Sequence, residues 1–311
     1  MSTTVDFHTH FFSRTFFDAL NAASPLAGSP EERLEDVTKS AGITLPKADP
    51  LDHWADWSVE LDRYGVDHVV TFASCPEEAP VVSKVIEAAD GRASGFSVID
   101  PTADNAEARA EQLLGDLGYK GLLLFPAMHG FHPSGEEASR VLAVVDRYEA
   151  VATVHCGLLS VGLRDRFGLP REYDIAVANP LNLVPAADRF PNANLVVPHF
   201  GGGFFREALM AGTQCGNIYV DTSSSNSWMR TNPGRVTFVE VLERALAVFG
   251  ADRILFGTDS SVFPRGWRND LLTLQRESLG AIGGTPEHMR KVFGGNARRL
   301  LKLGSGVEAS V

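Results

Sequence analysis

Val5-Asp6-Phe7-His8-Thr9-His10 opens the patterned part of the sequence and reads as a β-strand. Residues two apart on a strand point to the same face, so His8 and His10 present two imidazole rings together. Neutral imidazole is a common protein ligand for transition metals. The spacing is compatible with a metal site, but equally with a strand that merely ends in polar residues, and the remaining sequence must decide.

Beyond this strand, short β-branched apolar runs alternate with segments of helical spacing. Strands are predicted at residues 67–73, 95–99, 120–125, 151–155, 194–198, 217–221 and 253–257, and helices at 54–64, 77–89, 103–117, 136–148, 179–189, 204–211, 235–249, 269–279 and 286–293. Such alternation indicates a parallel sheet covered by helices, and eight units in about 300 residues favour a (β/α)8 TIM barrel. An open doubly wound sheet would need a glycine-rich turn after the first strand, where Phe11 and Phe12 stand.

We expect a single domain over residues 1–304 and a disordered tail over 305–311. The segment from about 13 to 52 is rich in Ala, Ser, Pro, Gly and charge, and we interpret it as an insertion with one or two short helices over the mouth of the first strand. A tolerated surface insertion is the alternative. The three glycines at 201–203 precede a helix, where a tight turn is favoured over an anion-binding helix start.

Composition narrows the classes of partner. The formal net charge of −11 argues against a broad basic surface for nucleic acid. Three scattered cysteines without a C-x-x-C spacing favour a reducing compartment, and we expect a cytoplasmic protein. The sequence has neither a signal-peptide pattern nor an apolar run of about 18 residues, so no membrane span is expected. A small-molecule substrate is the expected partner, and a homo-oligomer remains open.

Metal-capable side chains gather at the carboxyl ends of the predicted strands. His8 and His10 end the first strand, His155 ends the fifth, His199 follows the sixth and Asp259 follows the eighth. Active sites of TIM barrels are built at these ends. Five such groups at one mouth would lack partners without a shared cation, so the sequence predicts a divalent metal site.

Several segments, in this order, resemble the amidohydrolase superfamily, in its branch with the aminocarboxymuconate-semialdehyde decarboxylases and related hydrolases. The matching segments are Asp6-Phe-His-Thr-His10, Val154-His155-Cys-Gly157, Pro198-His199-Phe-Gly-Gly202, Leu255-Phe-Gly-Thr-Asp259 and Gly295-Asn-Ala-Arg-Arg-Leu300. The resemblance implies that the metal ligands are His8, His10, His155 and Asp259. It further implies that His199 is the catalytic acid/base beside the metal, and Asp259 can also accept a proton from water.

The same resemblance bears on the number and kind of metal ions. Two-metal members carry a bridging lysine or glutamate on the fourth strand, where this sequence has Leu123 and Phe125. We therefore predict one divalent ion, with zinc as the first expectation and manganese or iron as alternatives, because three histidines and an aspartate suit several metals.

Residues for substrate binding are harder to select from the sequence. Arg164 and Arg265 fall on loops at the mouth and could clamp a substrate carboxylate, although a solvated surface charge is the common alternative. Phe125 and Trp267 could line an apolar cavity there, although such aromatics more often belong to the core.

Three functional hypotheses follow. The first is a metal-dependent hydrolase, in which metal-bound hydroxide attacks a carbonyl carbon of a small organic acid, amide or lactone. The second is a non-oxidative decarboxylase of the same fold, in which His199 protonates the developing carbanion; an arginine that clamps a carboxylate would favour it. The third is a barrel that binds metal without turnover, which predicts that some of the five side chains do not converge.

Overall fold

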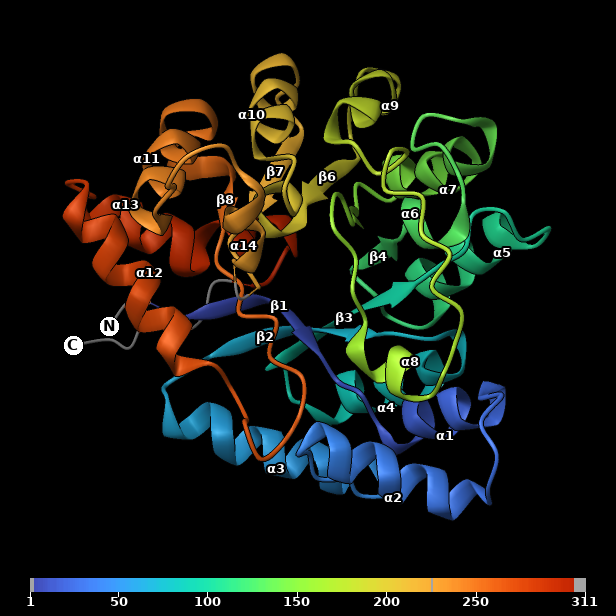
Figure 1. Ribbon diagram of the computed structural model, residues 1–311. Coiled ribbons are helices and arrows are strands. Elements are labelled where there is room, and N and C mark those ends of the chain that lie inside the picture. Colours follow the sequence, from blue (N-terminus) through green and yellow to red (C-terminus); the bar gives the residue numbers. More distant parts are fainter. Residues whose placement is uncertain (1–2, 225, 305–311) are drawn as a thin grey trace.

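Eight parallel strands form a closed ring in the computed structural model, which describes residues 3–224 and 226–304 (Figure 1). Neighbours pair in chain order, and the strands are β1 (Val5–His10), β2 (His68–Ala73), β3 (Ala93–Val98), β4 (Gly121–Leu124), β5 (Val151–Val154), β6 (Asn194–Val197), β7 (Ile218–Asp221) and β8 (Ile254–Leu255). The ring closes where the Phe7 N–H donates to the Phe256 carbonyl and the His10 N–H to the Ser260 carbonyl, both at 2.8 Å. The prediction of a (β/α)8 barrel is confirmed.

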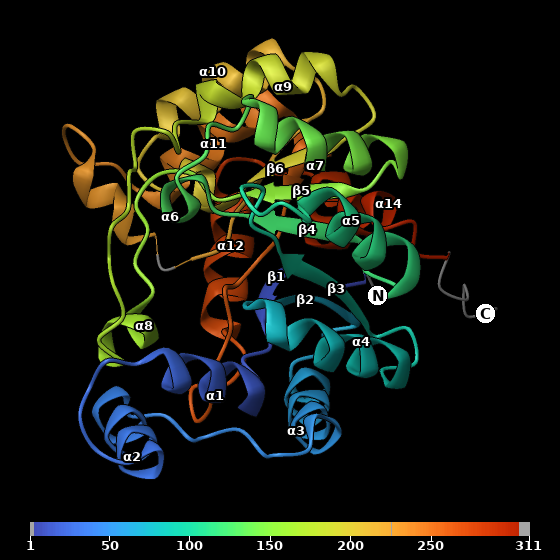
Figure 2. The ribbon, with the colours of Figure 1, turned by 90° about the vertical axis from the view of Figure 1, so that its right-hand side faces the viewer.

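Helices surround the ring (Figure 2). They are α3 (Pro50–Arg63), α4 (Ala79–Ala88), α5 (Ala106–Glu111), α7 (Glu136–Arg147), α9 (Val184–Arg189), α10 (Phe205–Gln214), α11 (Phe238–Phe249) and α12 (Asn269–Ala281), followed by α13 (Pro286–Arg290) and α14 (Asn296–Leu300). The strands between them are apolar on both faces because one face meets helices and the other fills the ring. Within the described ranges, no helix combines the length and apolar character that a membrane crossing requires.

The inside of the ring is packed solid below its carboxyl end. Phe7, Phe72, Phe96 and Leu123 fill it, and Leu300 of α14 packs against the same cluster. The helix α14 was absent from the sequence-based prediction because five residues give too little periodicity to recognise. With the interior filled, polar side chains at the carboxyl ends of the strands are the ones left facing an open mouth.

Helices α1 (Arg14–Ala23) and α2 (Pro30–Ala41) occupy the segment that we interpreted as an insertion. They pack with α8 (Gly162–Arg166), which follows β5, around a small apolar cluster that includes Phe16, Leu34 and Phe167 (Figures 1 and 2). The prediction left the stretch after β5 as a loop, because a five-residue helix is too short to show a pattern. This separate cluster forms a cap at one side of the mouth.

The three glycines at 201–203 form a tight turn, and the next helix begins only at Phe205. All three have positive φ angles. A Cβ atom on Gly157 would lie 2.3 Å from the carbonyl oxygens of both Gly201 and Gly202. The ends of β5 and β6 can therefore approach one another only because side chains are missing there. The tail over 305–311 lies outside the described residues.

Candidate active site

A β-bulge in β1 aims the first histidine at the mouth. Asp6 pairs with Val69 and Thr9 pairs with Thr71, so between these two pairs β1 contains one residue more than β2. Phe7 packs inside the ring while His8, the next residue, lines the cavity above it. On a regular strand these neighbours would point to opposite faces, so the bulge provides both a core side chain and a site side chain.

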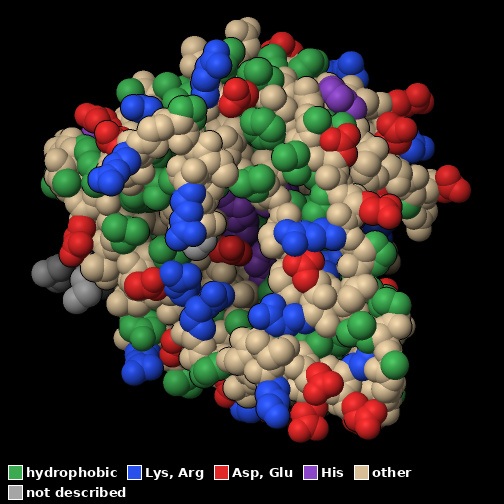
Figure 3. Space-filling view, viewed as in Figure 1, with side chains coloured by type: hydrophobic (Ala, Val, Ile, Leu, Met, Phe, Trp, Pro, Cys, Tyr) green, Lys and Arg blue, Asp and Glu red, His purple; other side chains and the backbone are tan. Residues whose placement is uncertain are grey.

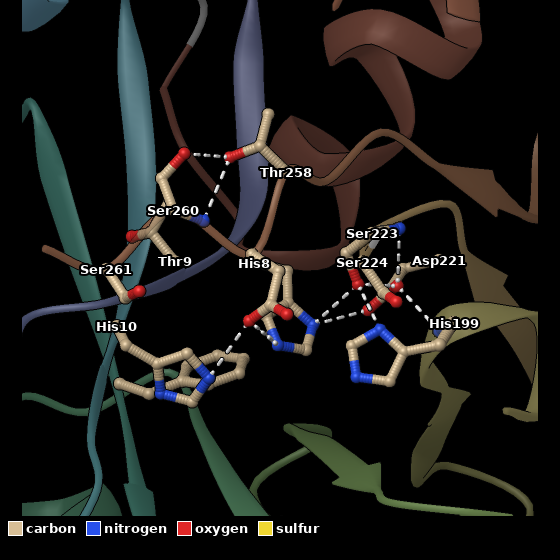
Figure 4. Close-up of polar contacts among 12 residues, drawn as sticks. His8, Thr9, His10, His199, Asp221, Ser223, Ser224, Thr258, Ser260 and Ser261 are labelled. Carbon is tan, nitrogen blue, oxygen red and sulfur yellow. Dashed lines mark hydrogen bonds and ion pairs between the residues drawn. The ribbon is translucent and has the colours of Figure 1, made fainter. Parts of the chain in front are cut away.

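The imidazoles of His8 and His10 meet the Asp259 carboxylate. In Figure 4, His8 lies between His10 and His199. Oδ1 of Asp259 lies 3.3 Å from Nε2 of His10 and 3.8 Å from Nε2 of His8. Asp259 adopts φ +59° and donates its N–H to the His8 carbonyl at 2.8 Å. Burial alone would raise the pKa of the Asp259 carboxyl, but the hydrogen bond and charge of His10 hold that pKa well below its ordinary value. The carboxylate is thus ionised and shared between two ring nitrogens.

Asp221 at the end of β7 fixes the tautomer of His8. Its Oδ2 accepts a hydrogen bond from Nδ1 of His8 at 2.8 Å, and its Oδ1 accepts from the backbone N–H groups of His199 and Ser223, each at 3.0 Å. Burial would raise the pKa of Asp221, but the charge and hydrogen bond of His8 lower it to about 2. Burial lowers the pKa of His8, but the charges of Asp221 and Asp259 raise it above its ordinary value. Because Asp221 holds one proton on Nδ1, the proton that His8 gives up to bind a metal ion is the one on Nε2.

His199 is held by the same group of residues. The Ser223 hydroxyl donates to Oδ1 of Asp221, so Ser223 Oγ accepts from Nδ1 of His199 at 2.8 Å. Nε2 of His199 makes no hydrogen bond to any residue in the described ranges, and the side chain lines the cavity. Burial and the charge of His8 lower the pKa of His199, which leaves the imidazole neutral near pH 7. His199 also adopts φ +57°, and such left-handed residues cluster at functional sites.

His155 brings an unsatisfied nitrogen to the group. Its ring centroid lies 5.3 Å from that of His199 and 5.3 Å from that of Phe125, which stacks on it. Its Nδ1 is buried and has no partner in the part of the chain that the structure describes. Burial, together with His199 and His8, lowers the pKa of His155 to about 3, so the ring is neutral. A buried imidazole nitrogen without a partner is costly, and a cation bound to its lone pair would satisfy it.

These residues fit a divalent ion. The donor set is the ionised Asp259 carboxylate, the neutral imidazoles of His10 and His155, and Nε2 of His8, which can bind an ion once its proton is displaced. Such nitrogen and oxygen donors suit first-row divalent metals. His8, His10 and Asp259 have ligand atoms within 4.8 Å of one another. His8, His199 and Asp221 form a second such group, but Nδ1 of His8 is already occupied by Asp221. His155 belongs to neither group and approaches from the His199 side.

The site opens into a cavity of about 540 Å³. Figure 3 shows histidine side chains in a hollow with Lys or Arg side chains on both sides of it and below it. Of the residues predicted to bind substrate, Phe125, Arg164 and Arg265 line this cavity. Trp267 does not: its indole N–H donates to the buried Asp6 carboxylate at 2.7 Å, and its ring packs beside Tyr64 and Phe256. A buried indole takes the place where its N–H finds a partner, which the sequence pattern does not reveal.

Three contributors to this arrangement were missed in the sequence. Asp221 ends a strand that was predicted at 217–221, so the rule that selected His155 could have selected it as well. Ser223 and Ser74, whose Oγ lies 2.7 Å from Nδ1 of His10, carry no signal in the sequence, because serines are common in loops at strand ends.

Solved structures share this fold at low sequence identity. A 5-carboxyvanillate decarboxylase from Sphingomonas paucimobilis is 15% identical, with a TM-score of 0.68 over 97% of this chain and 100% of that chain. An uncharacterised TIM-barrel protein from Bordetella bronchiseptica is 20% identical, with a TM-score of 0.66 over 97% of this chain and 99% of that one. A protein from Pseudomonas putida, described as a putative 2-pyrone-4,6-dicarboxylic acid hydrolase, is 16% identical. Its TM-score is 0.61 over 98% of this chain and 100% of that chain.

Comparison of the sequence itself points to one family. No curated protein matches the chain. The family model described as amidohydrolase matches residues 5–303, which is nearly the whole sequence. That match includes both histidines of β1 and Asp259 after β8. The family and the fold together imply a divalent metal ion. The chain therefore belongs to the amidohydrolase family and is an enzyme of that superfamily.

Proposed function

We propose that the protein is a metal-dependent hydrolase that cleaves a small carboxylated substrate, an amide or lactone, at a carbonyl carbon. The observation that carries this proposal is the setting of His199. Ser223 holds Nδ1 of the ring, so the free Nε2 is the atom available in the cavity beside His8. A neutral imidazole with a free nitrogen is a base that can take a proton from attacking water.

A single divalent ion would be held by His8, His10, His155 and Asp259, with zinc as the first expectation and manganese or iron as alternatives. When bound, such an ion supplies Lewis acidity that polarises a carbonyl group and makes water more acidic. We infer a single ion from β4 and the residue after it, because Leu123 and Phe125 line the cavity there and offer neither a carboxylate nor an amine to bridge a second ion.

The chain's own residues assist in three ways. Nε2 of His199 takes a proton from water and returns it to the leaving group. Asp221, through Ser223, stabilises the positive charge that His199 then carries. Arg265 lines the cavity near Asp259 and holds a carboxylate of the substrate, because in the described ranges its guanidinium bonds only to Ser261 Oγ, at 3.0 Å.

The test combines substrate profiling with one variant. Zinc-loaded protein is assayed against a panel of small carboxylated lactones and amides, and turnover is compared with that of His199→Asn. We expect kcat to fall by about 10²- to 10⁴-fold while metal content stays at one ion per chain. His132→Asn is the control, because His132 is exposed and outside the cavity. Unchanged turnover in His199→Asn would refute the role of this base.

A second candidate function is non-oxidative decarboxylation. It is favoured by Arg265, because a cation whose one hydrogen bond within the described ranges goes to a hydroxyl can hold the substrate carboxylate beside the departing group. The C–C bond breaks, its electron pair stays on the substrate carbon, and carbon dioxide leaves. His199, which is neutral at rest, takes up a proton from solvent and delivers it to that carbon. Measuring carbon dioxide release against hydrolysis over the same panel separates the two reactions.

The ligand assignment has its own test. Metal analysis of His10→Ala and Asp259→Asn should give less than one ion per chain. Full metal content in both variants would refute the ligand set while leaving the fold assignment intact.

A further inference from the structure

The wall of the cavity formed after β4 and β5 holds polar groups that the proposed reaction does not use. His129 ends the short helix α6 (Pro126–His129), and Arg164 lies on α8. Both line the same cavity as the catalytic histidines. Phe125 separates this wall from the metal side, because its ring stacks on His155 at 5.3 Å and meets His129 edge-on at 6.4 Å.

Two buried nitrogens on this wall lack partners. Nδ1 of His129 and Nε of Arg164 are both buried without a hydrogen bond among the described residues. Asp100 Oδ1 is 3.9 Å from Nδ1 of His129, too far for a hydrogen bond, and instead accepts from the N–H and hydroxyl of Thr102 at 2.9 and 2.8 Å. Nε of Arg164 always carries a hydrogen, and Nδ1 of His129 can carry one. Buried polar groups without partners are rare in folded proteins unless a ligand satisfies them.

The charge of the wall indicates what kind of ligand fits. Arg164 is absent from the ion pairs of the described residues, whereas its neighbour Asp165 pairs with Arg171 at 3.4 Å. Among the described residues, Arg166, the next cation on α8, bonds only to backbone carbonyls. Two arginines against the half-exposed Asp100 leave this wall positive. A positive wall with free N–H donors suits a carboxylate or another acidic group.

We propose that His129 and Arg164 form a distal subsite that binds a second acidic group of the substrate, while its reacting end lies at the histidine cluster. The inference rests on the proposed function and adds the substrate class. That class is a flat, unsaturated or aromatic molecule with acidic groups at opposite ends, because one aromatic side chain, Phe125, separates the two ends of the site. A cavity of about 540 Å³ is large enough for such a molecule.

The test measures binding rather than turnover, so that it is independent of the reaction. Benzene-1,4-dicarboxylate and benzoate are titrated calorimetrically into the zinc-loaded protein and into Arg164→Gln and His129→Asn. We expect the wild type to prefer the dicarboxylate by roughly 10- to 100-fold, the strength of one charge-assisted contact, and each variant to lose most of that preference while its affinity for benzoate changes less than about twofold. Arg171→Gln is the matched control, because Arg171 is a neighbouring cation outside the cavity.

Each outcome decides the proposal. A wild type that binds both probes equally, or neither, overturns the subsite, as does a variant that weakens both probes by the same factor. Arg265→Gln should weaken both probes, because it acts at the shared metal end. A loss limited to Arg265→Gln would thus refute the distal subsite while supporting the proposed function. Selective loss in Arg164→Gln from a protein without turnover would do the opposite.

Discussion

Replacing Asp221 by asparagine tests whether a residue outside the proposed ligand set controls the affinity of the protein for its metal ion. The amide oxygen of Asp221→Asn will keep the Oδ1 position, because two backbone N–H groups, from His199 and Ser223, point there. The amide nitrogen then occupies the Oδ2 position, 2.8 Å from Nδ1 of His8, and faces it as a donor. His8 must therefore accept at Nδ1 and carry its proton on Nε2, the nitrogen that faces Asp259.

The cost follows from the same contacts. To bind an ion through Nε2, His8 must return its proton to Nδ1, where two N–H donors would then oppose each other in a fully buried place. Leaving a buried donor unsatisfied costs about 1–3 kcal/mol, which corresponds to roughly a 5- to 150-fold loss of metal affinity. Partners of metal-binding histidines typically have effects of this size.

The assay is a competition titration of the metal-free protein with a chelator, for Zn²⁺ and Mn²⁺ separately. Asp146→Asn is the control, because Asp146 also accepts hydrogen bonds from two backbone N–H groups, those of Asn192 and Ala193. These residues precede β6 and lie at the opposite end of the barrel from the candidate site. We expect normal affinity in the control. A dissociation constant for Asp221→Asn within twofold of the wild type, in a protein that unfolds at the normal temperature, would refute this reasoning.

Three further changes test the scaffold. Burial lowers the pKa of His68 to about 4, so unfolding takes up a proton below pH 6.5 and the wild type should lose up to roughly 3 kcal/mol of stability as the pH falls from 6.5 to 4. His68→Asn keeps a donor for the Gly91 carbonyl and should lose less stability in urea titrations at pH 7 and 5. Equal losses in the two proteins would contradict this. Glu78 accepts from the N–H groups of Ser13 and Ser74 at 2.5 and 2.7 Å, and Ser74 in turn contacts Nδ1 of His10. Glu78→Gln should therefore loosen Ser74 and weaken metal binding by up to about tenfold in the chelator titration. An unchanged metal affinity would be the contrary result. Gly157→Ala should lower the free energy of unfolding by roughly 1–3 kcal/mol, because its Cβ would meet two carbonyl oxygens at a positive φ; an unchanged urea midpoint would mean that the turn at 201–203 can yield.

The predicted strand ends named most of the candidate site from the sequence alone. Each of His8, His10, His155, His199 and Asp259 was placed at the carboxyl end of a strand, and the structure brings all of them to one mouth. This worked because a parallel barrel sends every strand end to the same side, whatever the distance along the chain. Helix α8, by contrast, is stabilised by contacts with α2 rather than by its own periodicity, and short elements of this kind are hidden from pattern analysis.

The sequence by itself determined the alternation of strands and helices, the closed ring that follows from it, and the set of side chains at its mouth. Only the tertiary structure decided the bulge that turns His8 toward the cavity. It also decided the hydrogen bonds that Asp221 accepts from His8 and His199, and the hydrogen bond from Trp267 to Asp6. The reason is physical. Periodicity reports which face of an element is buried, whereas hydrogen bonds depend on partners that lie more than 200 residues away, as in the pair of His8 and Asp221.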